Sequence, residues 1–273
     1  MASRAIVKKQ DVVFTALFGQ YESLNELVIS KNPETKYVCF TDDSSLTSET
    51  WEVIVVEPII QGNSSRSSRE IKMLGHKLFP EGTRSLYIDN TVRLKVDGSI
   101  VLEEWLKQAN ITFMRHYSRK TVRGEFFACS AYGLDNQKKI WNQFKYYKRN
   151  YPTVLSQRPH WGGMIARVNS TETDKFMETW KQQFDTFTKR DQLSINVSSI
   201  ISGIEIATIS GENDSSEWHE WPVYTNRKTQ MRDKTSGRRF RKLRIIVNGL
   251  RYGYRFYIPF GIKSSLDDWE IKA

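Results

Sequence analysis

The amino-acid sequence predicts an α/β fold in which helices flank a mostly parallel sheet. Short apolar runs alternate with turn-rich or helical segments over about the first 95 residues, which is the order of strand–helix–strand units. Of the 273 residues, 39% are hydrophobic and 12% aromatic, which is enough for a substantial core and excludes a disordered chain. The chain has neither an apolar run of transmembrane length nor a signal-peptide-like N-terminus, so we expect it to be cytoplasmic.

Four apolar runs are the predicted strands of the first half. They span residues 11–17, 36–43, 51–58 and 84–94, while residues 18–27 are expected to turn and enter a helix. Right-handed connections place the C-terminal ends of parallel strands at one edge of the sheet. Ligands of open α/β sheets bind at that edge, so the residues that end these strands are candidates for a site.

The candidate strand-end residues are Thr15, Asp42 and Asp89, and Asp89 is the most informative of them. It directly follows an apolar run that reads as a core strand. A carboxylate at the edge of a sheet costs less than one in the core, and it can bind a metal ion or a ribose hydroxyl. The alternative is that Asp89 caps the turn that comes after it.

The helix predicted within residues 61–80 has a basic face. At about 100° per residue, its basic side chains fall within an arc of roughly 120°, opposite an apolar side that can pack on the sheet. The basic residues are Arg66, Arg69, Lys72 and His76, and the apolar ones are Ile71, Leu74 and Leu78. Such a face beside a carboxylate suits a metal-bound diphosphate, because Arg and Lys bind phosphate oxygens and Asp holds the cation. The alternative is a basic face that meets only solvent.

The second half of the chain adds further helices and a strand entered through glycines. A basic stretch that contains Glu125 leads into a long helix that ends near Pro152. Two glycines open the apolar run of residues 162–168, and glycine lets a ligand approach the backbone closely. Asp191 and Gln192 begin another apolar helix, where an acidic residue most often serves as a cap.

The positive charge of the chain is concentrated near its C-terminus. The net charge is +10, and residues 226–255 contain 11 Lys/Arg against one acidic residue, so the rest of the chain is neutral. Asn248-Gly249 between apolar runs predicts a β-hairpin in this segment. We therefore expect a main domain of residues 1–225 and a basic extension, residues 226–273, packed on it. Its mixture of basic and aromatic residues also suits nucleic-acid binding, the less favoured alternative.

Seven short motifs, in this order, resemble nucleotide-sugar glycosyltransferases of the GT-A fold. They are TALFGQYESL, FTDD, SREIKMLGHKLFP, LYIDNTVRL, HYSRKTVRGE, HWGGMIARV and RDQLS, within residues 11–205. The likeness is greatest to the branch found in plant and bacterial cell-surface polysaccharide proteins and in glycosyltransferase-like proteins of large algal viruses. It implies a GT-A-like (Rossmann-like) domain that transfers a sugar from a UDP- or GDP-sugar to a hydroxyl of a glycan or glycoprotein acceptor.

The resemblance also implies where the donor would bind. The loop after the first strand, together with Asp42, would hold the nucleoside, and the basic helix would meet the diphosphate. The implied donor-binding residues are Thr15, Phe18, Gly19, Tyr21, Asp42, Arg66, Arg69, Lys72, Asp89, Asn90, His160, Gly162 and Gly163.

The resemblance also implies a bound metal ion, Mn²⁺ or Mg²⁺. Asp89 matches the first acid of the Asp-x-Asp motif of these enzymes, but Thr91 stands in place of the second acid. Enzymes of this fold often add a late histidine, and His219 is the residue that fits that role here. We therefore expect a metal site made of Asp89, Thr91 and His219, with Mn²⁺ favoured because imidazole is a softer ligand than carboxylate.

Asp191, Glu125 and Gln192 are the expected catalytic residues. A carboxylate, from Asp191 or Glu125, would stabilise an oxocarbenium-like transition state, and the Asp191–Gln192 pair resembles that of some retaining enzymes. The expected function is a metal-dependent, retaining glycosyltransferase of hexosyltransferase type, and a homodimer is one option for its oligomeric state. An inactive sugar-nucleotide binder, a nucleotidyltransferase and a nucleic-acid-binding protein are the alternatives.

Overall fold

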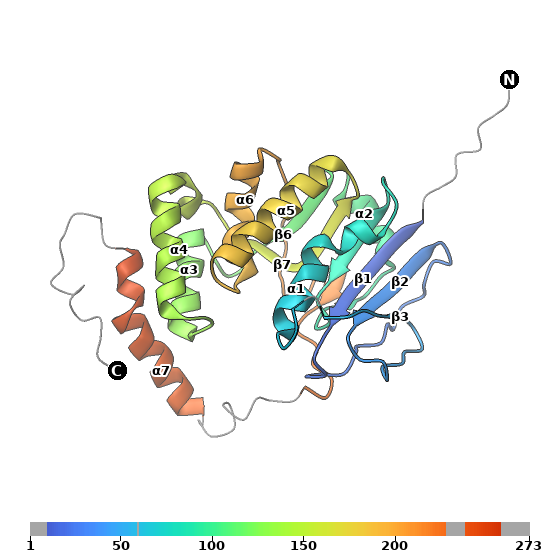
Figure 1. The fold of residues 1–273 in the computed structure, drawn as a ribbon, viewed down its shortest axis with the longest axis horizontal. Coiled ribbons are helices and arrows are strands. Elements are labelled where there is room, and N and C mark those ends of the chain that lie inside the picture. The colour runs from blue at the N-terminus through green and yellow to red at the C-terminus, as the bar shows by residue number, and fades with distance from the viewer. Residues whose placement is uncertain (1–9, 59, 228–237, 258–273) are drawn as a thin grey trace.

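The computed structural model describes residues 10–58, 60–227 and 238–257, and its centre is a seven-stranded sheet (Figure 1). The strand order is β3-β2-β1-β4-β7-β6-β8. The strands are β1 (Asp11–Leu17), β2 (Thr35–Thr41), β3 (Glu52–Val55), β4 (Arg84–Ile88), β6 (Ile111–Arg115), β7 (His160–Val168) and β8 (Ala207–Ile209). A separate antiparallel pair consists of β5 (Arg93–Leu94) and β9 (His219–Glu220).

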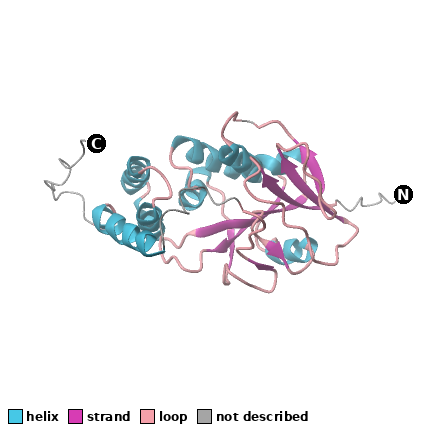
Figure 2. Cartoon of the chain, turned by 90° about the horizontal axis from the view of Figure 1, so that it is seen from below, coloured by secondary structure: helices cyan, strands magenta, loops and turns pink. Residues whose placement is uncertain are grey.

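Helices cover both faces of the sheet (Figure 2). Helix α2 (Gly98–Trp105) packs on one face, while α1 (Ser64–Leu74) and α5 (Thr171–Thr186) pack on the other. A third apolar cluster joins α3 (Val122–Tyr132), α4 (Gln137–Asn150) and α6 (Ile195–Ser202). Short 3₁₀ turns are η1 (Gly75–Leu78), η2 (Pro152–Ser156) and η3 (Asp191–Ser194). In the described ranges, no helix is both long and apolar enough to cross a membrane.

The predicted α/β class is confirmed. Strand β1 pairs in parallel with β2 and β4, and β2 pairs in parallel with β3, so the C-terminal ends of four strands meet at one edge. Strand β7 is antiparallel to both β4 and β6, which makes the sheet mixed but mostly parallel. The apolar run of β1 is continuous because both of its faces are covered: Val13 lies in one core cluster and Phe14 in the other.

Residues 18–34 correct the prediction of an early helix, because they contain neither helix nor strand. The backbone N–H of Asn25 donates to Asn90 Oδ1 at 3.0 Å, and the Trp51 indole N–H donates to the Asn25 carbonyl at 3.0 Å. These long-range hydrogen bonds satisfy backbone groups that a helix would have paired locally. Leu24 and Leu27 are buried in the core although their segment is not helical, so tertiary contacts override the local signal.

The basic C-terminal segment corrects a second prediction, because it forms a helix and not a hairpin. Helix α7 spans Arg238–Arg251, and η5 (Gly253–Phe256) comes after it. The Asn248-Gly249 pair lies inside α7, where apolar residues recur at helical spacing and outweigh the turn signal. Residues 228–237 and 258–273 lie outside the described residues, so the boundary after residue 225 stays a prediction.

Candidate functional site

Two neighbouring cavities lie near the C-terminal ends of the parallel strands. The first, which we call the charged cavity, has a volume of about 590 Å³. Its walls come from the loop after β1, α1, the end of β4, the segment after β6, α3, η3 and residues 213–227. The second, which we call the edge cavity, has a volume of about 520 Å³. Glu22 lines both cavities, so the two share a wall at this residue.

A buried lysine–aspartate pair lines the charged cavity. Lys72 Nζ lies 2.7 Å from Asp191 Oδ2 and 3.5 Å from Asp89 Oδ1, and the side chains of Lys72 and Asp191 are only 2% and 5% exposed. Arg69 Nε lies 3.3 Å from the same oxygen of Asp191. The hydroxyl of Tyr87 donates to Asp89 Oδ1 at 2.8 Å. Two cations and two carboxylates therefore meet at the end of β4.

The surrounding cations keep Asp191 ionised. Burial alone would raise its pKa, but Lys72, Arg69 and Arg190 hold the pKa of this carboxyl well below its usual range. Burial opposes the charge of Arg69 as well, yet the Asp191 and Asp89 carboxylates raise the pKa of its guanidinium. The cluster thus holds fixed charges of both signs in a shielded place, where electrostatic interactions are stronger than in water.

Strand β7 holds Lys72 in position. The fully buried Arg167 donates to the Lys72 carbonyl at 2.9 Å and to the Met73 carbonyl at 3.1 Å, which satisfies the last turn of α1. A Cβ atom at Gly162 would lie 3.1 Å from Lys72 Nζ, so this glycine makes room for the ion pair. A Cβ atom at Gly163 would likewise clash with the indole of Trp161. The two glycines, which we expected to admit a ligand, instead admit side chains of the protein itself.

A second charged group stands on another wall of the charged cavity. Arg119 Nε donates to Glu125 Oε2 at 3.1 Å, and His116 Nε2 lies 3.8 Å from the same oxygen. Burial raises the pKa of Glu125, although Arg119 and Arg190 oppose this shift. Burial also lowers the pKa of His116 to about 4, and nearby arginines act in the same direction. The imidazole is therefore uncharged at neutral pH and can accept a hydrogen bond.

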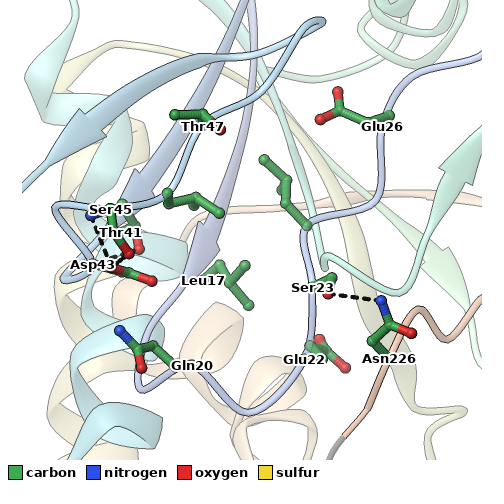
Figure 3. A pocket seen from close by; sticks show the side chains of 12 residues that line it. Leu17, Gln20, Glu22, Ser23, Glu26, Thr41, Asp43, Ser45, Thr47 and Asn226 are labelled. Carbon is green, nitrogen blue, oxygen red and sulfur yellow. Dashed lines mark hydrogen bonds between the residues drawn. The ribbon is translucent and has the colours of Figure 1, made fainter.

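The edge cavity lies beside the ends of β1 and β2 and is lined mainly by polar side chains (Figure 3). Asn226 Nδ2 donates to Ser23 Oγ at 3.3 Å, the contact drawn on the right of Figure 3, and this joins the segment after β9 to the loop after β1. Arg227 Nε lies 3.4 Å from Glu22 Oε2, and its guanidinium lies over the ring of Tyr224. A late segment of the chain therefore helps to form both cavities.

Gly19 and Asp42 shape the loop that leads into the edge cavity. Gly19 has a φ of +80°, which favours glycine, and a Cβ atom there would lie 2.4 Å from Ser64 Oγ. Asp42 Oδ1 accepts a hydrogen bond from the Gly19 backbone N–H at 2.8 Å. Asp42 is thus engaged in holding this turn.

The structure brings a large part of the predicted site together. The predicted residues that line the charged cavity are Tyr21, Arg69, Lys72, Asp89, Asn90, Thr91, Glu125, Asp191 and Gln192. They belong to segments spread over about two thirds of the chain, and the fold gathers them at the predicted edge of the sheet.

Other predicted residues lie outside both cavities. Thr15 lies within β1 and is fully buried, and Phe18, directly after this strand, is buried in an apolar cluster. Arg66 pairs instead with Asp185 of α5 at 3.3 Å. His160 forms hydrogen bonds inside the protein through both ring nitrogens, at 3.1 and 3.0 Å. These four residues are therefore removed from the candidate site.

The charged cavity does not offer the ligand set of a divalent cation. Within residues 10–58, 60–227 and 238–257, no group of three His, Cys, Asp or Glu side chains could hold a metal ion. Thr91 Oγ1 accepts a hydrogen bond from the Trp221 indole N–H at 3.2 Å, and Asp89 has Lys72 as its near neighbour. Since Lys72 and Arg69 would repel another cation, the expected Mn²⁺ or Mg²⁺ does not fit these residues, whereas an anion does.

His219 is corrected as a metal ligand. It is fully buried, and its Nδ1 forms a hydrogen bond with Ser216 Oγ at 2.8 Å. Its Nε2 forms another with the Asn213 carbonyl at 2.9 Å, and the ring stacks on Trp161 with 5.3 Å between centroids. Because both ring nitrogens are engaged, His219 has none free for a metal ion. It instead fixes the segment that carries Asn213 and Trp221 to the cavity wall.

Sequence reasoning missed several residues of the charged cavity. Arg190 lines it next to Asp191, and this adjacency in the sequence is a signal that could have identified it. Trp221, Tyr224 and Arg227 also line it, although they come after the last recognisable motif. The pairing of β5 with β9 brings this late segment beside the residues that follow β4, and no local sequence pattern predicts such a pairing.

Comparisons with solved structures show only a distant likeness. Mouse xyloside xylosyltransferase 1 is 12% identical, with a TM-score of 0.40 over 74% of this chain and 85% of that protein. The glycosyltransferase GlyE of Streptococcus pneumoniae is also 12% identical, with a TM-score of 0.38 over 96% of this chain and 64% of that one. At these TM-scores the likeness supports no conclusion about the activity of this chain.

Sequence comparisons are more informative. The chain is 33% identical over 156 residues to the probable hexosyltransferase MUCI70 of Arabidopsis thaliana, which covers 54% of this chain but only 27% of that protein. A 93-residue stretch is 30% identical to the polyketide synthase PksM of Bacillus subtilis, over 33% of this chain and 2% of that protein. The family model of the TOD1/MUCI70 glycosyltransferase-like domain matches residues 3–205, most of the chain. The chain therefore belongs to the TOD1/MUCI70 glycosyltransferase-like family.

Proposed function

We propose that this chain transfers a hexose from a nucleoside diphosphate sugar to a hydroxyl of a glycan or glycoprotein acceptor, on a GT-A-like domain. The observation that carries the proposal is the group of Arg69, Asp89 and the buried pair Lys72–Asp191 at the C-terminal edge of the parallel strands. Family membership supports glycosyl transfer, and the name of the Arabidopsis relative supports a hexose.

The two adjacent cavities suit an elongated donor. The edge cavity beside β1 and β2 would take the nucleoside, with UDP as the first candidate and GDP as the second. Glu22, at the junction, would accept a hydrogen bond from a ribose hydroxyl. The diphosphate would then reach Arg69 and Lys72, which bind phosphate oxygens through charge-assisted hydrogen bonds.

Departure of the nucleoside diphosphate is the difficult step. The bond between the sugar C1 atom and the phosphate oxygen breaks, so negative charge grows on the phosphate and positive charge on C1. Lys72 and Arg69 would neutralise the negative charge on the phosphate, because they are positioned before the reaction begins. The ionised Asp191 would stabilise the positive charge on C1. No step in this route passes through a metal ion.

The state of Asp191 favours retention of the anomeric configuration. A carboxylate whose pKa is held far below its usual range is a poor base for the acceptor hydroxyl. The departing phosphate oxygen would take that proton, while the acceptor oxygen bonds to C1 on the face that the phosphate leaves. Glu125 and the uncharged His116 would orient the acceptor from the other wall.

Calorimetric titration with UDP and GDP, in chelator and again with Mn²⁺, tests the donor site. We expect one of the nucleotides to bind, with affinities in the two buffers that agree within about twofold, because Arg69 and Lys72 supply the positive charge. If neither nucleotide binds in either buffer, the proposed function fails. Binding that requires Mn²⁺ would keep the donor site and overturn its independence of metal.

A further inference from the structure

Helix α7 has an apolar stripe that no described part of the chain covers. Leu243, Ile246, Val247 and Leu250 recur at i, i+3, i+4 and i+7, so they lie on one face of the helix. Their side chains are 57%, 57%, 47% and 73% exposed. Single exposed apolar residues are ordinary, but four on one helix face form a patch that marks an interaction site.

The stripe is not the face that holds α7 to the protein. Helix α7 packs on α3, as Figure 1 shows, and Asn248 Nδ2 donates to the Ala131 carbonyl at 3.3 Å. Asn248 lies roughly 150° around the helix from the centre of the stripe. Phe256 of η5 is buried in the third apolar cluster, and its carbonyl accepts a hydrogen bond from Arg123 at 3.2 Å. The helix is thus anchored on one side and presents the stripe on the other.

The charge of this segment indicates what the stripe meets. Residues 238–251 contain six Lys/Arg and no acidic residue, and residues 226–255 contain 11 against one. An apolar stripe on a strongly basic helix is the pattern of helices that lie in the interface of a membrane. Lipid phosphates and carboxylates attract the basic residues, while the acyl region takes the apolar side chains. Nucleic acid would satisfy the charges but offers no apolar phase for the stripe.

We propose that α7 docks on the surface of an anionic lipid bilayer, parallel to it, with the stripe at the boundary between headgroups and acyl chains. This mode of binding needs no membrane-spanning segment. It is independent of the proposed enzymatic function, because the stripe and the charged cavity share no residue. Docking would confine the protein to a membrane plane.

Vesicle sedimentation with the full chain tests this proposal. We expect binding to phosphatidylserine-containing vesicles to exceed binding to phosphatidylcholine vesicles by about tenfold or more, and to weaken strongly at about 1 M salt. The triple variant Leu243→Gln, Ile246→Gln and Leu250→Gln should lose this binding. Glutamine preserves helix propensity and these positions are exposed, so circular dichroism should remain unchanged. A matched control is Ile100→Gln, Ile200→Gln and Ile201→Gln, which changes exposed apolar residues of α2 and α6 and should bind like the unmodified protein.

Several outcomes would overturn the proposal. One is an unmodified protein that ignores anionic vesicles, and another is a stripe variant that binds them as well as the control does. Stripe-dependent dimerisation in sedimentation experiments without lipid would identify a second copy of the chain as the occupant. Binding to RNA or DNA without binding to vesicles would show that the basic residues serve a nucleic acid instead.

Discussion

Replacing Lys72 by methionine should weaken nucleoside diphosphate binding by roughly 10- to 150-fold, the equivalent of about 1.5–3 kcal/mol for a hydrogen bond to a charged group. Lys72 is 2% exposed and sits between Asp191 and Asp89, so its ammonium cannot be replaced by water without rearrangement. Calorimetry on the variant measures the loss. The matched control is Arg66→Met on the same helix, which should bind normally because Arg66 pairs with Asp185 outside the cavities.

Folding must be separated from binding in this experiment. Removal of one partner from a buried ion pair destabilises a protein by about 3–5 kcal/mol, and Arg69 beside Asp191 should keep the loss towards the lower end. The double variant Lys72→Met with Asp191→Asn removes the unpaired charge, so its unfolding free energy should recover while its nucleotide affinity stays low. A double variant that binds as tightly as the unmodified protein would exclude Lys72 as a phosphate ligand.

Replacing Asp191 by asparagine should lower kcat on the order of 10²-fold while leaving nucleotide affinity equal or higher. The carboxylate is needed for the positive charge that develops on the sugar, but in the free protein it competes with phosphate for Lys72 and Arg69. The measurement is a comparison of kcat with the nucleotide Kd. An unchanged kcat would show that Asp191 serves only to fix the cations.

The same variant should change how stability depends on pH. The pKa of Asp191 is lower in the folded protein than the value of about 3.9 expected in an unfolded chain. Its ionisation therefore stabilises the fold above about pH 4, and this contribution is lost as pH falls through the folded pKa. Urea unfolding at several acidic pH values should show a smaller loss of stability for Asp191→Asn than for the unmodified protein.

The parallel half of the fold could be predicted because its signals are local. The apolar runs of β2 and β4 end in polar residues, and the handedness of the connections fixes the edge where these strands and β1 meet. The stretch after β1 could not be predicted, because Asn25 is held by Asn90, 65 residues away. In α7 a strong local turn signal, Asn248-Gly249, competed with helical spacing over a longer window and misled the interpretation.

The candidate site was predictable in part for a similar reason. Helical periodicity pointed to Arg69 and Lys72, and the strand end pointed to Asp89, but an arc of basic residues does not tell which of them line the charged cavity. Arg66 instead pairs with Asp185, which lies 119 positions away in the sequence. The pairing of Lys72 with Asp191 depends equally on long-range packing.

His219 is the clearest failure of the sequence interpretation. Its late position in the chain suggested a metal ligand, yet the ring is fully buried and both nitrogens are engaged. Burial of an imidazole depends on how distant segments pack, here on Trp161 of β7. Residue type and position alone do not reveal that environment.

Release of nucleoside diphosphate from UDP- and GDP-hexoses is the measurement that tests the central claim most directly. The unmodified protein and Lys72→Met are compared in chelator, with water or an added oligosaccharide as acceptor. We predict turnover of one of these donors by the unmodified protein, lowered by at least about tenfold in the variant, since each 1.36 kcal/mol of lost stabilisation is tenfold in rate. No release from any donor, or equal release by both proteins, would contradict the assignment of this charged cavity to glycosyl transfer.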